Sequence, residues 1–337
     1  MTRNYLKSIL KKGAVQSRLL CLANHFTTPA VVILRYHSIL NATEAQANCI
    51  GPSIIHSQHL FDKQMAAIAR NYNVVTLDDI CSCVANGDMP QKGVAITFDD
   101  GFKDNYTYAF PILEKYGIKA SFYITTGSIE SEYPPWFCRL QHAFRTTEKT
   151  VWVDSKNGEV KSLLDSESWR SSFLKASRRC ALLTGEKQSG EICQIEKDLG
   201  VSPLTSQADI MMNWEEVREL YRHGHIIGSH TQTHPNVALL GDLELSSELE
   251  GSKKVLEEQL QAPVAHFSYP SPIGTPHYTH ETIRTAKSLG YQTSVTCTAG
   301  RVLKGDNALA LKRIAVPFDI TEFLWKLELC FLGIDNR

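Results

Sequence analysis

The sequence lacks a long hydrophobic run. Its longest early apolar stretch, Ala30–Leu34, has the length of a strand, whereas a helix that crosses a bilayer needs about 20 apolar residues. A secretory signal is not evident either, because Lys7, Lys11, Lys12 and Arg18 interrupt the apolar residues at the start of the chain. We therefore expect a cytoplasmic protein.

Neither sign of charge dominates. Lys and Arg number 35, Asp and Glu number 36, and the net charge is -1, which argues against nucleic acid as a partner. With 43% hydrophobic and 21% charged residues, the chain has the composition of a globular protein. Residues 1–43 nevertheless contain several bases and no acid. For residues 1–28 we expect a basic amphipathic segment that covers the domain, with peripheral contact at the inner face of the membrane as the alternative.

The nine cysteines show no metal-ligand spacing. We interpret them as mostly buried free thiols in a reducing compartment.

Apolar strands alternate with helical patterns along residues 29–337, which predicts one domain of parallel βαβ units. Expected strands include Ala30–Arg35, Gly93–Phe98 and Ala120–Ile124, and His59–Arg70 has helical spacing. The number of units favours an α/β fold of the distorted or incomplete (β/α) barrel type over a short open sheet.

The alternation breaks at about residues 130–210, which we interpret as a mainly helical insertion in one connection of the barrel. Asn157-Gly158 lies between two short apolar segments and predicts a hairpin with a type I′ turn. Trp136 and Trp152 in this region, and Trp214 after it, are candidates to stack on sugar rings, with a role as packing anchors as the alternative. The insertion either builds the substrate rim or forms a packed lid without specific contacts.

Two adjacent carboxylates end the strand Gly93–Phe98, in Thr97-Phe98-Asp99-Asp100-Gly101. Barrel enzymes place catalytic groups at this end of a strand. Neighbouring side chains of a strand point to opposite faces, but the glycine allows a turn that directs both carboxylates into one pocket. A bound cation would keep both ionised, and the alternative is a solvated Asp-Asp-Gly turn.

Two histidines lie four residues apart in His230-Thr231-Gln232-Thr233-His234-Pro235. They would meet on one face if this segment makes a single helical turn, which Pro235 would end. Two histidines and one carboxylate with an open position form a catalytic metal site. The same ligand types also occur in non-haem iron oxygenases, although a hydrolase has a use for the second carboxylate as a general base.

These two motifs, in this order, resemble the first two signature motifs of the polysaccharide deacetylases, the NodB-homology or carbohydrate esterase 4 group. Residues from about 30 to 315 follow the family order apart from the insertion. The resemblance implies a distorted (β/α) barrel that removes N- or O-linked acetyl groups from sugars. It also implies that Asp99 is the general base and that Asp100, His230 and His234 hold the metal.

The later motifs depart from the family pattern. Where the family has Arg-x-Pro-aromatic, this chain has Ser268-Tyr269-Pro270-Ser271, which resembles a Tyr-Pro-x-Gly version of exopolysaccharide-cluster members. The resemblance places Tyr269 and Ser271 at the substrate or oxyanion. Arg313 occupies the place of the usual acid histidine and is a candidate to replace the missing arginine that orients the base.

The general acid must then come from elsewhere. One branch of the family supplies it from a Tyr-His pair near the first strand, and this chain has Tyr36-His37 after Ala30–Arg35. The first and last strands of a closed barrel are neighbours, so we expect His37 to be the acid.

The expected activity is metal-dependent hydrolysis of N-acetyl groups of amino sugars in a cell-surface polysaccharide or its lipid-linked precursor, with Zn²⁺ as the expected ion. The alternatives are an O-deacetylase with the same site, or a glycan-binding protein with a degenerate, inactive site. The sequence leaves the oligomeric state open.

Overall fold

The structure is a computed structural model that describes residues 13, 28–41, 43–44, 49–205 and 209–334. The predicted basic segment 1–28 lies, except for residues 13 and 28, outside the described residues.

A sheet of eight parallel strands forms the centre of the molecule, in the order β11-β10-β9-β6-β5-β1-β12, with β4 beside β5. The strands are β1 (Val31–Tyr36), β4 (Asn73–Val74), β5 (Gly93–Phe98), β6 (Ser121–Ile124), β9 (Ile226–Ser229), β10 (His266–Ser268), β11 (Thr293–Val295) and β12 (Arg313–Ala315). The first strand pairs with the last, with Ile33 opposite Arg313. A single bridge between Val295 and Leu311 joins β11 to the segment before β12. The sheet therefore curls into a nearly closed, distorted (β/α) barrel, as predicted.

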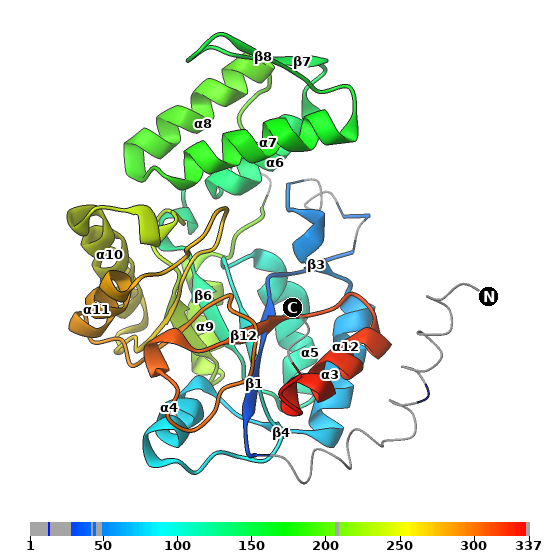
Figure 1. The fold of residues 1–337 in the computed structure, drawn as a ribbon, viewed down its shortest axis with the longest axis vertical. Coiled ribbons are helices and arrows are strands. Elements are labelled where there is room, and N and C mark those ends of the chain that lie inside the picture. Colours follow the sequence, from blue (N-terminus) through cyan, green and yellow to red (C-terminus); the bar gives the residue numbers. More distant parts are fainter. Residues whose placement is uncertain (1–12, 14–27, 42, 45–48, 206–208, 335–337) are drawn as a thin grey trace.

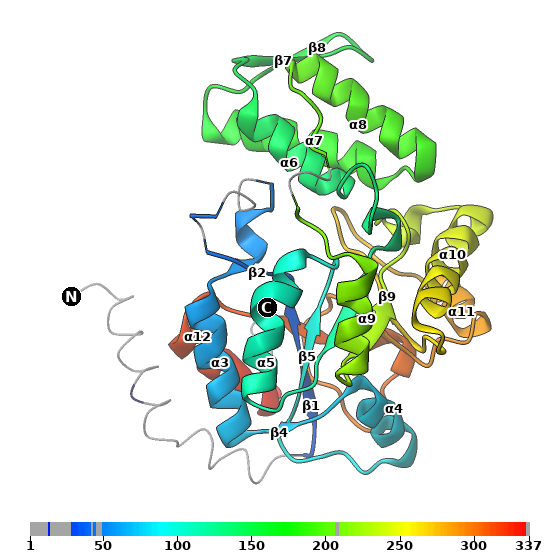
Figure 2. The ribbon, with the colours of Figure 1, turned by 180° about the vertical axis from the view of Figure 1, so that it is seen from behind.

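Helices surround this sheet (Figures 1 and 2). They are α3 (Gln58–Asn71), α4 (Leu77–Asn86), α5 (Phe110–Lys115), α9 (Trp214–Arg222), α10 (Asp242–Leu260), α11 (His280–Ser288) and α12 (Ile320–Phe331). Their local sequences explain where they begin and which face they bury. In α3, for example, Ser57 caps the first turn through the Leu60 N–H, and Phe61, Met65 and Ile68 are buried on one face.

The insertion occupies the connection between β6 and β9 and rises above the carboxyl ends of the strands (Figure 1). It consists of α6 (Trp136–Thr146), β7 (Val151–Asp154), β8 (Glu159–Ser162), α7 (Ser166–Ala181) and α8 (Gly185–Leu199). A separate apolar cluster, centred on the fully buried Trp152 with Leu140, Phe144 and Ile195, holds these elements together. The insertion thus has its own small core.

The hairpin of the insertion differs from the predicted one. Asp154 pairs with Glu159, so four residues connect the strands, and Asn157 is not in the left-handed region that a type I′ turn requires. The Asp154 carbonyl accepts hydrogen bonds from the Asn157 and Gly158 N–H groups at 3.3 and 2.8 Å, and Asn157 Oδ1 accepts one from the Glu159 N–H. These bonds stabilise the longer loop.

Candidate active site

A cavity of about 180 Å³ lies at the carboxyl ends of the strands, between the barrel and the insertion. Residues from the barrel and from the insertion form its wall. They are His37, Ile54, Asp99, Asp100, Trp136, Phe137, Phe173, Ser177, His230, His234, Ser271, Pro272 and Ile273. Six of the eight site residues predicted from the sequence therefore line one cavity.

The two adjacent aspartates reach this cavity because the backbone turns between them. Asp99 continues the sheet, with its N–H donating to the Tyr36 carbonyl. Asp100 has φ 81° and Gly101 has φ 89°, a left-handed conformation that aspartate and glycine tolerate better than other residues. Both carboxylates consequently point to the same side instead of alternating.

The two histidines meet as expected, but the segment between them is not a helical turn. Thr231 and His234 have φ values of 67° and 57°, and Thr231 Oγ1 accepts a hydrogen bond from the His234 N–H. Glu248 of α10 accepts hydrogen bonds from the next two N–H groups, those of Gln232 and Thr233. These side-chain acceptors replace the hydrogen bonds of a helical turn and hold a bent loop in its place.

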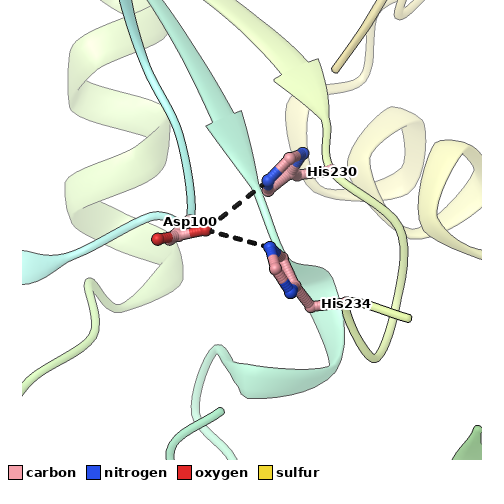
Figure 3. A group of neighbouring side chains, drawn as sticks. All are labelled: Asp100, His230 and His234. Carbon is pink, nitrogen blue, oxygen red and sulfur yellow. Dashed lines mark ion pairs between the residues drawn. The ribbon is translucent and has the colours of Figure 1, made fainter. Parts of the chain in front are cut away.

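Asp100, His230 and His234 come together at the base of the cavity (Figure 3). Their ligand atoms all lie within 4.8 Å of one another, and Asp100 Oδ1 is 3.5 and 3.4 Å from the Nε2 atoms of His230 and His234. His230 Nδ1 is 2.8 Å from the Ser268 carbonyl. That carbonyl requires the proton on Nδ1 and leaves the Nε2 lone pair directed at Asp100.

This arrangement fits a divalent cation. Asp100 Oδ1 is buried and has no hydrogen-bond partner among the described residues. Burial alone would raise the pKa of Asp100, yet the imidazoles of His230 and His234 hold it well below the usual range. Two imidazoles and one carboxylate are the protein ligands of many catalytic Zn²⁺ sites.

Arg313 binds the neighbouring carboxylate. Its Nη1 and Nη2 donate to the two oxygens of Asp99 at 2.8 and 2.7 Å, and Ser268 Oγ donates to Asp99 Oδ1. Burial alone would raise the pKa of Asp99, but the Arg313 guanidinium keeps it well below the usual range. Arg313, on the last strand, thus contacts Asp99, as expected if it replaces the arginine that orients the base.

His37 lies in the cavity wall near Asp99, directly after β1. Its Nε2 is 3.9 Å from Asp99 Oδ2, and its side chain is 19% exposed. Burial lowers the pKa of His37 to about 4, although Asp100 and Asp99 oppose this shift. The imidazole is therefore neutral at pH 7, within reach of Asp99.

The two residues expected near the oxyanion have different positions. Ser271 lines the cavity. Tyr269 does not, because its side chain is buried, its hydroxyl donates to the Leu309 carbonyl and its N–H donates to the Val295 carbonyl. The expectation that Tyr269 contacts the substrate or oxyanion is corrected, since both of its donors are used inside the fold.

Two phenylalanines that close the cavity from above belong to no motif of the sequence and were not predicted. Phe137 on α6 and Phe173 on α7 line it, and the Phe137 ring is 4.7 Å from that of His234. Trp136 also lines it, and its Nε1 donates to the His234 carbonyl at 3.1 Å. The insertion therefore contacts a candidate metal ligand directly and forms part of the cavity wall.

The chain belongs to the polysaccharide deacetylase family, whose model matches residues 86–169 and 183–294. It is therefore a hydrolase of the carbohydrate esterase 4 group, which acts on N-acetyl bonds. The Bacillus subtilis (strain 168) protein YxkH, provisionally named as a polysaccharide deacetylase, is 25% identical over 286 residues, which cover 84% of this chain and 70% of YxkH.

Solved structures share the fold. The Streptococcus pyogenes deacetylase PplD, in complex with acetate, has a TM-score of 0.59 at 20% identity and covers 89% of this chain and 99% of its own. IcaB from Ammonifex degensii has a TM-score of 0.57 at 20% identity, with 90% and 98% of the two chains covered. These likenesses confirm the predicted NodB-type (β/α) barrel.

None of the described helices has the combination of length and hydropathy that spanning a membrane requires.

Proposed function

We propose that the protein is a metal-dependent deacetylase that hydrolyses N-acetyl groups of amino sugars in a cell-surface polysaccharide or its lipid-linked precursor. The observation that carries the proposal is the buried cluster of Asp100, His230 and His234 beside Asp99. Family membership supplies the reaction class, and the cluster supplies the groups that this reaction needs.

In this proposal, Asp100, His230 and His234 hold the divalent ion, with Zn²⁺ as the expected species. When bound, the ion polarises the acetyl carbonyl and lowers the pKa of water. The Ser268 carbonyl orients His230 through Nδ1, and the N–H of Trp136 holds the carbonyl of His234.

Asp99 is the proposed general base. Arg313 keeps it ionised and fixes both of its oxygens, so it is ready to take a proton from the attacking water. His37 is the proposed general acid. Because its pKa is about 4, we infer that it receives its proton during the reaction, from Asp99 at 3.9 Å, and passes it to the leaving amine.

The cavity wall suits a neutral sugar. Apart from the groups assigned above, the described residues that line it are apolar or carry hydroxyls: Ile54, Trp136, Phe137, Phe173, Ser177, Ser271, Pro272 and Ile273. Aromatic side chains pack against the C–H faces of sugars, and hydroxyls bind their polar edges. We therefore propose an uncharged acetamido sugar as the group that enters.

The test is acetate release from acetylated amino-sugar oligomers by Zn²⁺-loaded protein. We expect release that disappears in Asp99→Asn and in His230→Ala, with the folded state of both variants checked by circular dichroism. Oligomers carrying only O-acetyl groups are the matched substrate, and release from these alone would identify an O-deacetylase instead. Fractionation of cells would check the predicted cytoplasmic location and membrane contact.

A glycan-binding protein without turnover is the second candidate, favoured by the replacement of the family's arginine by Ser268 and of its acid histidine by Arg313. The contact between Arg313 and Asp99 argues against it, because the guanidinium is supplied from another strand. Glycan binding without any acetate release would support this candidate.

A further inference from the structure

A second cluster of reactive groups lies beside the cavity, just after β11. Cys297 Sγ is 3.4 Å from His277 Nδ1, and the Ser271 hydroxyl lies close enough to the same thiol to lower its pKa. The guanidinium of Arg35, at the end of β1, faces this sulfur as well. Arg35 Nε is buried and lacks a hydrogen-bond partner among the described residues. An imidazole, a hydroxyl and a guanidinium thus surround one half-buried sulfur.

The charges around this sulfur favour its ionised form. Burial alone would raise the pKa of Cys297, but His277, Ser271 and Arg35 together lower it to about 7. The Arg313 guanidinium adds positive charge from β12, and the nearby carboxylate of Asp99, directly after β5, is paired with it. Thiolates, not thiols, are the nucleophilic form of cysteine.

We propose that Cys297 is a modification site, a thiolate held by His277 and Arg35 that reacts with small electrophiles such as hydroperoxides and, once modified, obstructs the deacetylase cavity. The site lies outside the proposed catalytic groups. None of the residues assigned to metal binding or proton transfer contributes the reacting atom.

The reaction with a hydroperoxide balances without a further reactant. The sulfur electron pair forms an S–O bond while the O–O bond breaks, and the leaving hydroxide takes a proton from solvent. Sulfur loses two electrons, the peroxide gains them, and Cys297 becomes a sulfenic acid. With iodoacetamide, the C–S bond forms as the C–I bond breaks, and iodide leaves.

The obstruction follows from Ser271. This residue contacts Cys297 and, with Pro272 and Ile273, lines the cavity. A group added to the sulfur therefore displaces the Ser271–Ile273 loop or fills space beside it. Cys81 offers a matched control in the same chain, because it is also half-buried while burial and Asp78 raise the pKa of its thiol.

The first test measures the rate of iodoacetamide labelling at each cysteine across neutral pH, by mass spectrometry of peptides. A free thiol has a pKa of about 8.5, so at pH 7 Cys297 is ionised about 15-fold more. The lower nucleophilicity of a low-pKa thiolate offsets part of this gain. We expect Cys297 to react at least about threefold faster than Cys81 at pH 7, and its rate to level off above neutrality while that of Cys81 still rises.

The variant His277→Phe keeps a ring but removes the partner of the thiol. We expect Cys297 labelling at pH 7 to slow severalfold and the Cys81 rate to stay unchanged, which also reports that the fold is intact. Equal rates and equal pH profiles for the two cysteines in the wild type would overturn the proposal. The same holds if hydrogen peroxide and a dimedone trap mark Cys81 as readily as Cys297.

The second test compares acetate release before and after labelling. We expect labelled wild-type protein to lose at least about 90% of its activity, and Cys297→Ser to keep its activity under the same treatment. Full labelling at Cys297 without loss of activity would refute the obstruction. If the untreated protein releases no acetate from any substrate, the proposed function fails, whereas the labelling rates still decide whether Cys297 is a reactive thiolate.

Discussion

The pair formed by Arg313 and Asp99 allows a quantitative prediction. Their side chains are only 1% and 4% exposed, and two hydrogen bonds of 2.8 and 2.7 Å join them. In Arg313→Met, Asp99 keeps only the hydrogen bond from Ser268 and becomes a buried, uncompensated charge. Breaking such a pair costs about 3–5 kcal/mol.

Urea denaturation at pH 7 measures this cost. We expect Arg313→Met to lower the free energy of unfolding by about 3–5 kcal/mol, and the double variant with Asp99→Asn to regain a large part of it, because both charges are then gone. Arg222→Met is the matched control. Arg222 pairs with Glu215 at 2.6 Å on the surface, where the two side chains are 57% and 60% exposed, so its loss costs less than about 1 kcal/mol.

Activity supplies an independent readout of the same variant. We expect acetate release by Arg313→Met to fall about 10²–10⁴-fold, the usual contribution of a general base, while Zn²⁺ binding persists. If the losses of unfolding free energy in the two single variants simply add in the double variant, Arg313 and Asp99 are not coupled and the argument fails. Normal turnover by Arg313→Met would refute its role in holding the base.

Three further outcomes are expected. A chelator should abolish acetate release and Zn²⁺ should restore it, except in His234→Ala; activity that survives complete metal removal would contradict the metal site. Trp136→Phe removes the N–H that binds the His234 carbonyl and should weaken Zn²⁺ affinity at least about tenfold, measured by competition with a chromogenic chelator; unchanged affinity would show that the contact is dispensable. Burial lowers the pKa of His56 to about 4, below its unfolded value of about 6.5. Between these two pH values the unfolded state binds more protons than the folded state. The protein therefore loses about 3 kcal/mol of stability as the pH falls from about 6.5 to about 4. In His56→Gln the unfolding free energy should depend less on pH over this range. An unchanged pH dependence would exclude His56 as the cause of the loss of stability.

The site was predictable where the chemistry is local in sequence. Asp99-Asp100-Gly101 and the two histidines carry their own spacing, and the parallel strands bring the two motifs to one edge of the sheet. The left-handed conformations of Thr231 and His234 were not predictable, because they depend on Glu248, which comes from a helix that follows the motif.

The phenylalanines in the upper wall of the cavity could not be predicted from the sequence for a different reason. Phe137 and Phe173 lie on helices whose apolar faces read as ordinary core, and only the packing of the insertion turns part of these faces toward the barrel. Tyr269 shows the opposite error. A motif residue expected at the substrate is used to pack the barrel, since its neighbours β11 and Leu309 take both of its donors.

The adjacency of the first and last strands has a consequence for how such proteins diverge. β12 lies beside β1, and β5 lies on the other side of β1. Because the Arg313 side chain spans this one strand to bind Asp99, a positive charge can reach Asp99 from the last strand as well as from the strand that follows the histidines. Likewise, His37 follows the first strand and lies 3.9 Å from the same carboxylate. Motifs that seem eroded when read in linear order can thus be complete in space, and a search for lost activity in this fold should ask which strand now carries the missing group before concluding that the group is gone.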